Sequence, residues 1–236
     1  MKTIATAITF LCLAASCLGA PIPGGSGQRI RSSTTLPLGL ASGGGGGTTQ
    51  LGSDNFNRAN ETPLGGVWLL VGDTSGNFNL SGNSITPADL TFDDSFYLSG
   101  VTWPNDQWGQ VRVTVTGTSV GTGGGLILRG ANNGGARTFY RVCVCKAGAN
   151  NIEVHKHLAG VSSTPGNLTT TWVDGDVLQG RCTGGATTSI SVYQNGNLIG
   201  TVTDSSSPIL SGNVGVGFSS TSTACTLDDF AGGSVP

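Results

Sequence analysis

Charged side chains are scarce in this sequence. They make up 10% of its 236 residues, and the formal net charge is -2. A surface with so few cations cannot neutralise a run of phosphates, so nucleic-acid binding has no support as a function class. Only one Met is present, whereas Gly is abundant at 40 residues. This composition favours strands and turns over helices.

Long apolar runs are also missing, except at the N-terminus. The segment MKTIATAITFLCLAASCLGAPIP has one lysine, then an apolar run, then small residues. That is the layout of a secretory signal peptide, which we place at residues 1–19. No later run reaches the ~20 apolar residues that a membrane span needs. We therefore predict a secreted, extracellular protein without a membrane span.

Residues 20–52 are rich in Gly, Ser, Thr and Pro and include five glycines in a row from Gly43. Such a segment buries too little apolar surface to offset the entropy of ordering it, so we expect a flexible arm or linker. Its stretch RSSTTLPLGLA is apolar enough to dock on a neighbouring subunit, which would allow self-association. The remaining residues, 53–236, suit one β domain in length.

Four cysteines follow the signal peptide: Cys143, Cys145, Cys182 and Cys225. An even number in an exported protein predicts two disulfides. One residue of a predicted strand separates Cys143 from Cys145, which puts their Cα atoms ~6.5–7 Å apart and would strain a mutual bond. We therefore expect one of them to bond Cys182 and the other Cys225, with both connectivities open.

Three N-glycosylation sequons begin at Asn60, Asn79 and Asn167, where turns are expected. In a eukaryotic secretory pathway they would carry N-linked glycans. In a bacterial protein they would have no such meaning.

From Asp54 onward, short apolar-alternating runs are separated by turn residues at the spacing of a β-sandwich. In GQVRVTVTG, valines alternate with polar residues, so one face belongs to the core. The dipeptide Asn195-Gly196 between two alternating arms predicts a hairpin. The fold class is therefore all-β, an antiparallel two-sheet sandwich. The runs expected as strands include VWLLVG, WGQVRVTVTG, GGLILRG, TFYRVCVC, NIEVHKHL, TTTWVDG and CTLDDF.

Several longer motifs resemble those of the concanavalin A-like, laminin-G-like jelly-roll modules of secreted and cell-surface proteins. The resemblance runs from Asp54 to Gly233 and implies a jelly-roll sandwich. Because this superfamily includes sugar binders, adhesion modules, glycan-cleaving enzymes and structural spacers, the resemblance does not decide the function. The motifs are DNFNRANETPLGGVW, DQWGQVRVTVTGTSVGTGGGLILRG, TFYRV, WVDGDVLQGRCTGGATTSISVYQNGNLIGTVTD and LDDFAGG.

Catalytic motifs are lacking. Laminarinase-like members of the family carry an E-x-D-x-x-E strand, whereas Glu61 and Glu153 are the only glutamates here. A retaining glycosidase needs two carboxyl groups ~5–5.5 Å apart. Asp174 and Asp176 are close in sequence, but the glycine between them indicates a turn. Residues 117–121 match G-x-S-x-G, but they lie among strand patterns without the helix that a nucleophile elbow needs. We assign no catalytic residue and keep a polysaccharide hydrolase or lyase as an alternative.

The segment NIEVHKHLAG contains Glu153, His155 and His157 at alternate positions. In a strand these side chains share one face. Two histidines so placed can bind one metal ion, with zinc shared with the cysteines as the alternative to disulfides. The same face could contact a ligand on an open sheet. A solvated strand face is the favoured interpretation.

Aromatic side chains are the candidates for a sugar-binding platform, because a flat ring can stack on a sugar. We assign two of the tryptophans, Trp68 and Trp172, to the core. That leaves Trp103 or Trp108, helped by Arg129 or Tyr140 from nearby strands.

Aspartates on the first and last strands are the candidates for a calcium site. Asp54, Asp228 and Asp229 would lie close together if those strands are neighbours, as the resemblance implies. Clustered carboxylates suit Ca²⁺, and turn capping is the competing interpretation.

Together these observations predict a secreted, noncatalytic module that binds a glycan or another component of the cell surface or extracellular matrix. The second hypothesis is a structural subunit of an extracellular fibre or coat, assembled through the Gly-rich N-terminal arm.

Overall fold

The computed structural model describes residues 48–71, 77–88, 95–115, 123–133, 136–145, 152–219 and 225–236. All of them belong to the unit Leu40–Pro236. They form strands and connecting loops, and none of them forms a helix that could cross a membrane. The predicted signal peptide and residues 20–47 of the predicted arm lie outside the described residues.

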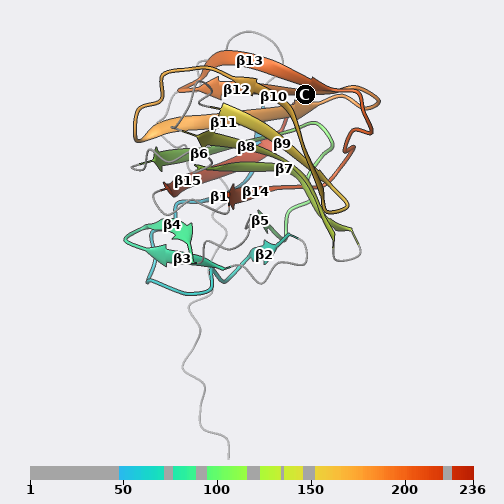
Figure 1. The fold of residues 1–236 in the computed structure, drawn as a ribbon. Coiled ribbons are helices and arrows are strands. Elements are labelled where there is room, and N and C mark those ends of the chain that lie inside the picture. Colours follow the sequence, from blue (N-terminus) through green and yellow to red (C-terminus); the bar gives the residue numbers. More distant parts are fainter. Residues whose placement is uncertain are drawn as a thin grey trace, which may run out of the picture. The chain divides into compact units, whose positions relative to one another are not determined.

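Two antiparallel sheets form the fold, which confirms the predicted all-β sandwich (Figure 1). Sheet A has eight strands in the order β13-β12-β11-β6-β15-β4-β3, with β1 also paired to β15. Sheet B has seven strands in the order β10-β9-β8-β7-β14-β5-β2. The strands of sheet A are β1 Thr49–Asp54, β3 Phe78–Ser81, β4 Ser84–Pro87, β6 Gln107–Val115, β11 Asp176–Thr183, β12 Thr188–Gln194, β13 Asn197–Asp204 and β15 Cys225–Ser234. Those of sheet B are β2 Trp68–Leu70, β5 Ser95–Leu98, β7 Gly123–Asn133, β8 Ala136–Cys145, β9 Ile152–Leu158, β10 Val161–Leu168 and β14 Asn213–Phe218.

The alternating pattern in the sequence determines which side of each strand is buried. In β6, Val111, Val113 and Val115 are fully buried, whereas the residues between them are partly exposed. The predicted hairpin is present between β12 and β13. Asn195 and Gly196 have φ values of 51° and 82°, as expected for the turn type that fits the twist of two antiparallel strands.

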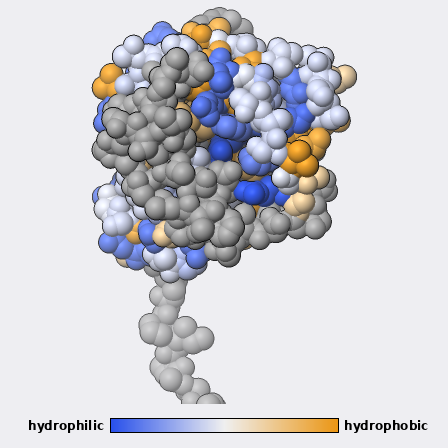
Figure 2. Space-filling model, in the orientation of Figure 1, coloured by the Kyte–Doolittle hydropathy of each residue, from blue (hydrophilic) through white to orange (hydrophobic). Residues whose placement is uncertain are grey.

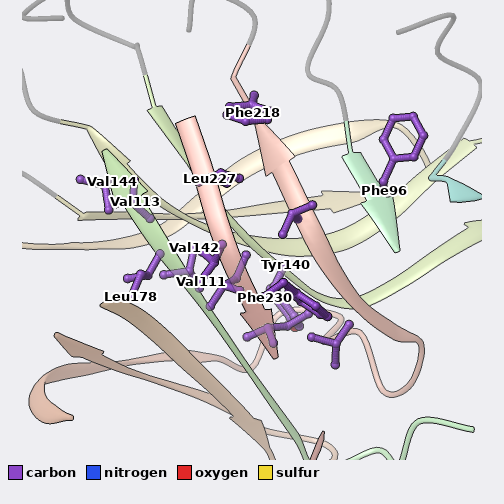
Figure 3. Close-up of a cluster of buried hydrophobic side chains, with 14 of the residues drawn as sticks. Phe96, Val111, Val113, Tyr140, Val142, Val144, Leu178, Phe218, Leu227 and Phe230 are labelled. Carbon is purple, nitrogen blue, oxygen red and sulfur yellow. The ribbon is translucent and has the colours of Figure 1, made fainter. Parts of the chain in front are cut away.

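The core lies between the two sheets (Figure 3). Valines of β6 and leucines of β11 and β15 meet side chains of β8 and β14 from the opposite sheet. Trp68 and Trp172 are buried, which confirms their assignment to the core. The side chains labelled in the close-up are Phe96, Val111, Val113, Tyr140, Val142, Val144, Leu178, Phe218, Leu227 and Phe230.

The structure corrects two strand assignments. The run TTTWVDG is not a strand: its residues lie in a loop and turn, and Trp172 reaches back to the carbonyl of Val113. Instead the preceding segment VSSTPGNL forms β10. Its proline argues against a strand, so the sequence pattern did not indicate one there. Because β10 is an edge strand with an irregularity between Ser163 and Gly166, it tolerates the missing N–H of Pro165.

The first strand of the described residues begins before the predicted boundary between residues 52 and 53. Strand β1 starts at Thr49, so the residues 49–52 assigned to the arm are part of sheet A. Gly52 is buried there, and a side chain at that position would collide with Leu98.

The surface carries no large apolar face in the view of Figure 2, where the described part is mostly hydrophilic with small, separated hydrophobic areas. Exposed large hydrophobic side chains are scattered over several strands and loops. Among the described residues they are Leu51, Leu69, Val161, Val173, Leu198 and Leu210.

Candidate functional site

Strands β8 and β9 bring the polar residues of NIEVHKHL beside the two neighbouring cysteines. Cys143 lies directly opposite Glu153, and Arg141 lies opposite His155. Since residues opposite each other in an antiparallel pair share a face, all four side chains stand on the outer face of sheet B. The Nε2 atom of His155 lies 2.7 Å from Oε2 of Glu153.

The sulfur atoms of Cys143 and Cys145 lie 3.6 Å apart and are not bonded. Both thiols are buried, and one ligand atom from each, with one carboxylate oxygen of Glu153, lie within 4.8 Å of one another. We call Cys143, Cys145, Glu153 and His155 the β8–β9 cluster.

The four predicted disulfide partners do not converge. Cys182 lies opposite Gln107, and Cys225 lies opposite Val115, at the two ends of β6. Eight residues of extended strand span ~26 Å. Cys143 is at the Cys225 end, because Gly124, beside its strand partner, contacts the Cys225 sulfur. This separation contradicts the predicted bond to Cys182, and all four cysteines are free in the structure.

Glycines of β7 make room for the cysteine pair. Gly123 lies opposite Cys145, and Gly125 lies opposite Cys143. A Cβ atom at Gly123 would lie 2.9 Å from the Cys145 sulfur, and one at Gly125 would lie 2.0 Å from the carbonyl oxygen of Val142. The glycine run is therefore part of the strand, where close packing excludes side chains.

The favoured solvated-face interpretation of Glu153, His155 and His157 is wrong. His157 is 2% exposed and packs against the ring of Phe139, with centroids 4.5 Å apart. The side chains of His155 and Glu153 are only 19% and 29% exposed. The alternation of polar residues was identified correctly, but sequence alone does not show that His157 is buried against Phe139 and that Glu153 and His155 are only partly exposed.

Proton affinities within the β8–β9 cluster are strongly shifted. A hydrogen bond with Cys145 lowers the pKa of Cys143 well below its usual range, helped by His155 and the charge of Arg141. The same hydrogen bond and burial raise the pKa of Cys145. The interaction with Cys143 raises the pKa of His155.

The predicted aromatic platform is not at the surface. Trp103 is 9% exposed and donates from Nε1 to the carbonyl of Leu98, and Trp108 is 2% exposed. Trp103 packs on Gly52 and Gly232, where the absence of side chains admits its ring. Trp103 belongs to the core and Trp108 is also buried, so neither tryptophan offers a stacking surface.

Arg129 and Tyr140, the predicted helpers, are also fully buried. Arg129 donates to the carbonyls of Asn105, Gly184 and Ile209 and thereby ties three loops together. Tyr140 points between the sheets and donates to Asp204. Both residues therefore have structural roles. Their polar side chains had suggested a binding role instead.

The three predicted calcium ligands lie near one another, and two of them, Asp54 and Asp229, pair with arginines. Strands β1 and β15 are paired, as expected. Both carboxylate oxygens of Asp54 accept from Arg58 at 2.9 Å, and one also accepts from Trp68. Asp229 pairs with an arginine of β6. Burial raises the pKa of Asp228, and the charges of Asp229 and Asp54 add to this. Asp54 and Asp229 are thus engaged by arginines, and calcium binding by the three aspartates stays a prediction.

Asp174 and Asp176 serve a turn. Asp174 accepts from the backbone N–H of Val115, and Asp176 accepts from Gln194 and Asn195. Burial opposes ionisation of Asp176, but these hydrogen bonds prevail and lower its pKa. A low pKa is the opposite of what a general acid needs.

Two of the three sequons adjoin each other. Asn60 and Asn79 line one shallow hollow, in which Thr62 donates to Asn79 at 2.6 Å. Asn79 lies in β3 and Asn167 in β10, so these two are on strands and not in the expected turns. Asn60 and Asn167 are exposed, and their glycosylation stays a prediction.

An outer face of sheet A was missed by the sequence analysis. The guanidinium of Arg181 lies over the ring of Tyr193, 4.5 Å from its centroid, and Nε donates to Gln179. Ser191, opposite Arg181, shares a hydrogen bond of 2.9 Å with Thr201. We call these five residues the β11–β13 face. Gln179 is buried, whereas Arg181, Ser191 and Tyr193 are partly exposed and alternate with buried Cys182, Ile190 and Val192, the signal that could have revealed the face.

Arg181 has N–H groups that are not used by the described residues. Its Nε atom is used by Gln179, and within the described chain no acceptor contacts its two Nη atoms. Arg181 and Tyr193 are both partly exposed. The pair thus presents a planar stacked surface and unused donors side by side.

Comparison with known proteins supports the fold. No family model matches this chain, and no curated protein sequence matches it. The carbohydrate-binding module CBM66 from Bacillus subtilis is 16% identical, with a TM-score of 0.55, over 71% of this chain and 96% of that one. The GH43 protein BlXynB from Bacillus licheniformis is 14% identical, with a TM-score of 0.54, over 78% of this chain and 39% of that one. At these identities the likeness shows a shared β-sandwich fold.

Proposed function

We propose that this protein is a secreted, noncatalytic glycan-binding module and that it binds sugar on the β11–β13 face. The stacked pair of Arg181 and Tyr193 carries the proposal. Sugars gain little from hydroxyl hydrogen bonds alone, because each replaces a bond to water. A planar apolar surface beside fixed donors supplies both parts of the recognition.

The geometry of the pair reduces the entropy lost on binding. The contact with the ring and the hydrogen bond to Gln179 hold the guanidinium in one orientation before a ligand arrives. A preordered side chain loses less freedom when it binds. The Ser191 and Thr201 hydroxyls extend the polar surface along the same row of the sheet. The shared fold with a carbohydrate-binding module agrees with this proposal.

A panel of immobilised neutral and acidic polysaccharides tests the proposal. We expect the full chain to be retained by at least one of them and Tyr193→Ala to lose that retention. Tyr97→Ala on sheet B is the matched control, because Tyr97 is also partly exposed but packs against Val71, Ile127 and Phe139. No retention on any polysaccharide, or equal retention of both variants, would contradict the proposal.

A further inference from the structure

The β8–β9 cluster is a group of metal-ligating side chains on sheet B, apart from the β11–β13 face on sheet A. Among the described residues it is the one place where three such groups lie within 4.8 Å of one another. We propose that Cys143, Cys145 and Glu153 bind one Zn²⁺ ion, with His155 as the positioning residue for Glu153.

The spacing of the two sulfur atoms carries this proposal. In tetrahedral coordination, two thiolates at the usual Zn–S distance lie about 3.8 Å apart. The observed separation is 3.6 Å, whereas a disulfide requires about 2.05 Å. The two sulfur atoms therefore already have nearly the separation that a shared zinc ion needs, without movement of the strand.

The third protein ligand comes from the neighbouring strand. Glu153 lies directly opposite Cys143, so its carboxylate reaches the same side of the sulfur pair. His155 contacts that carboxylate at 2.7 Å, the supporting contact that commonly orients a metal ligand. Two thiolates, one carboxylate and a divalent cation leave one negative charge. Arg141, which lies opposite His155, supplies the compensating positive charge.

The surroundings also fit a metal. Both cysteines are buried, which protects bound thiolates from solvent, while Glu153 is partly exposed and leaves a route of entry. Gly123 of β7 keeps the space beside the Cys145 sulfur free of a side chain. Cysteine, glutamate and histidine are ligand types that Zn²⁺ accepts.

Metal analysis of the reduced full chain tests this site. After incubation with Zn²⁺ and gel filtration, we expect one zinc per chain. Loading with Co²⁺ should give thiolate-to-metal charge-transfer absorption. Glu153→Gln should weaken zinc binding by more than ~100-fold, and His155→Asn by ~10–100-fold.

Two control variants make the test specific. Cys182→Ala removes a buried cysteine outside the cluster, and Glu61→Gln removes the other glutamate; both should bind zinc like the wild type. If Cys143→Ser does not fold, the partly exposed Glu153→Gln still decides the result. The proposal would be overturned by a reduced wild-type chain that holds no zinc, including one isolated with a Cys143–Cys145 bond. Equal losses in Cys182→Ala and Cys143→Ser would also overturn it.

Discussion

Replacing Asp204 by Asn tests a buried polar network of three side chains, Tyr140, Lys156 and Asp204. Lys156 Nζ lies 2.8 Å from the Asp204 carboxylate, and the two side chains are 7% and 5% exposed. Tyr140 donates to the same carboxylate at 2.7 Å and accepts from the N–H of Ile209. Lys156 also donates to the carbonyl of Ser206. The network thus joins β8, β9 and β13 to the loop that follows.

The expected cost follows from what the substitution leaves behind. Asn cannot carry the negative charge, so the ammonium of Lys156 stays buried without a counter-ion. Removing one partner of a buried ion pair costs ~3–5 kcal/mol of unfolding free energy. Asp229→Asn is the control, because its pair with Arg112 is about one-third exposed on each side. An exposed pair contributes only ~0–1 kcal/mol.

Urea unfolding of the two variants measures this difference. The double variant Lys156→Met/Asp204→Asn should lose less than the sum of its single variants, because it leaves no unpaired charge. If Asp204→Asn lowered the unfolding free energy by less than ~1 kcal/mol, or if the losses of the single variants were additive, the reasoning would be refuted. Removing one partner of a buried ion pair should destabilise the fold by more than that.

Four further results are expected. Burial raises the pKa of Asp204, but hydrogen bonds from Lys156 and Tyr140 prevail and lower it overall. Its contribution to stability is therefore present above the unfolded pKa of ~3.9 and is lost as the pH falls below it. Acid titration of unfolding should show a smaller loss in Asp204→Asn than in the wild type, and equal losses would contradict this assignment. Gly125→Ala should cost at least ~1–3 kcal/mol, because its Cβ would strike the backbone of β8. Gly185→Ala, which meets open space, should stay within ~0.5 kcal/mol, and equal effects would refute the register of β7 and β8. Trp103→Ala should lower the unfolding free energy by ~3–5 kcal/mol in chemical unfolding, and an unchanged value would contradict the burial of this ring.

Alternation along the strands and the Asn195-Gly196 turn were sufficient to predict the sandwich, because both depend on local chemistry. The β8–β9 cluster could not be predicted in this way, because the sequence does not reveal that Cys143 and Glu153 are partners across two strands. Trp103 and Tyr140 were misplaced for a related reason. Polar atoms on a buried side chain look like a binding site until the internal acceptor, such as Asp204 for Tyr140, is known.

The β11–β13 face was missed because its residues are common in strands and carry no motif. Arg181 and Tyr193 lie far enough apart in sequence that only the pairing of β11 with β12 brings them together. The contact of His157 with Phe139 on the outer face of sheet B was equally hidden, because the sequence does not show that these two residues lie opposite each other.

Mapping the bound glycan onto the protein tests the central proposal most directly. Isotope-labelled protein would be titrated with the polysaccharide that retains it, while backbone amide resonances are followed by NMR. We predict that the largest shifts occur in β11 and β12, around Gln179, Arg181 and Tyr193, and vanish in Tyr193→Ala. Shifts confined to sheet B, or to the hollow lined by Asn60 and Asn79, would contradict the account.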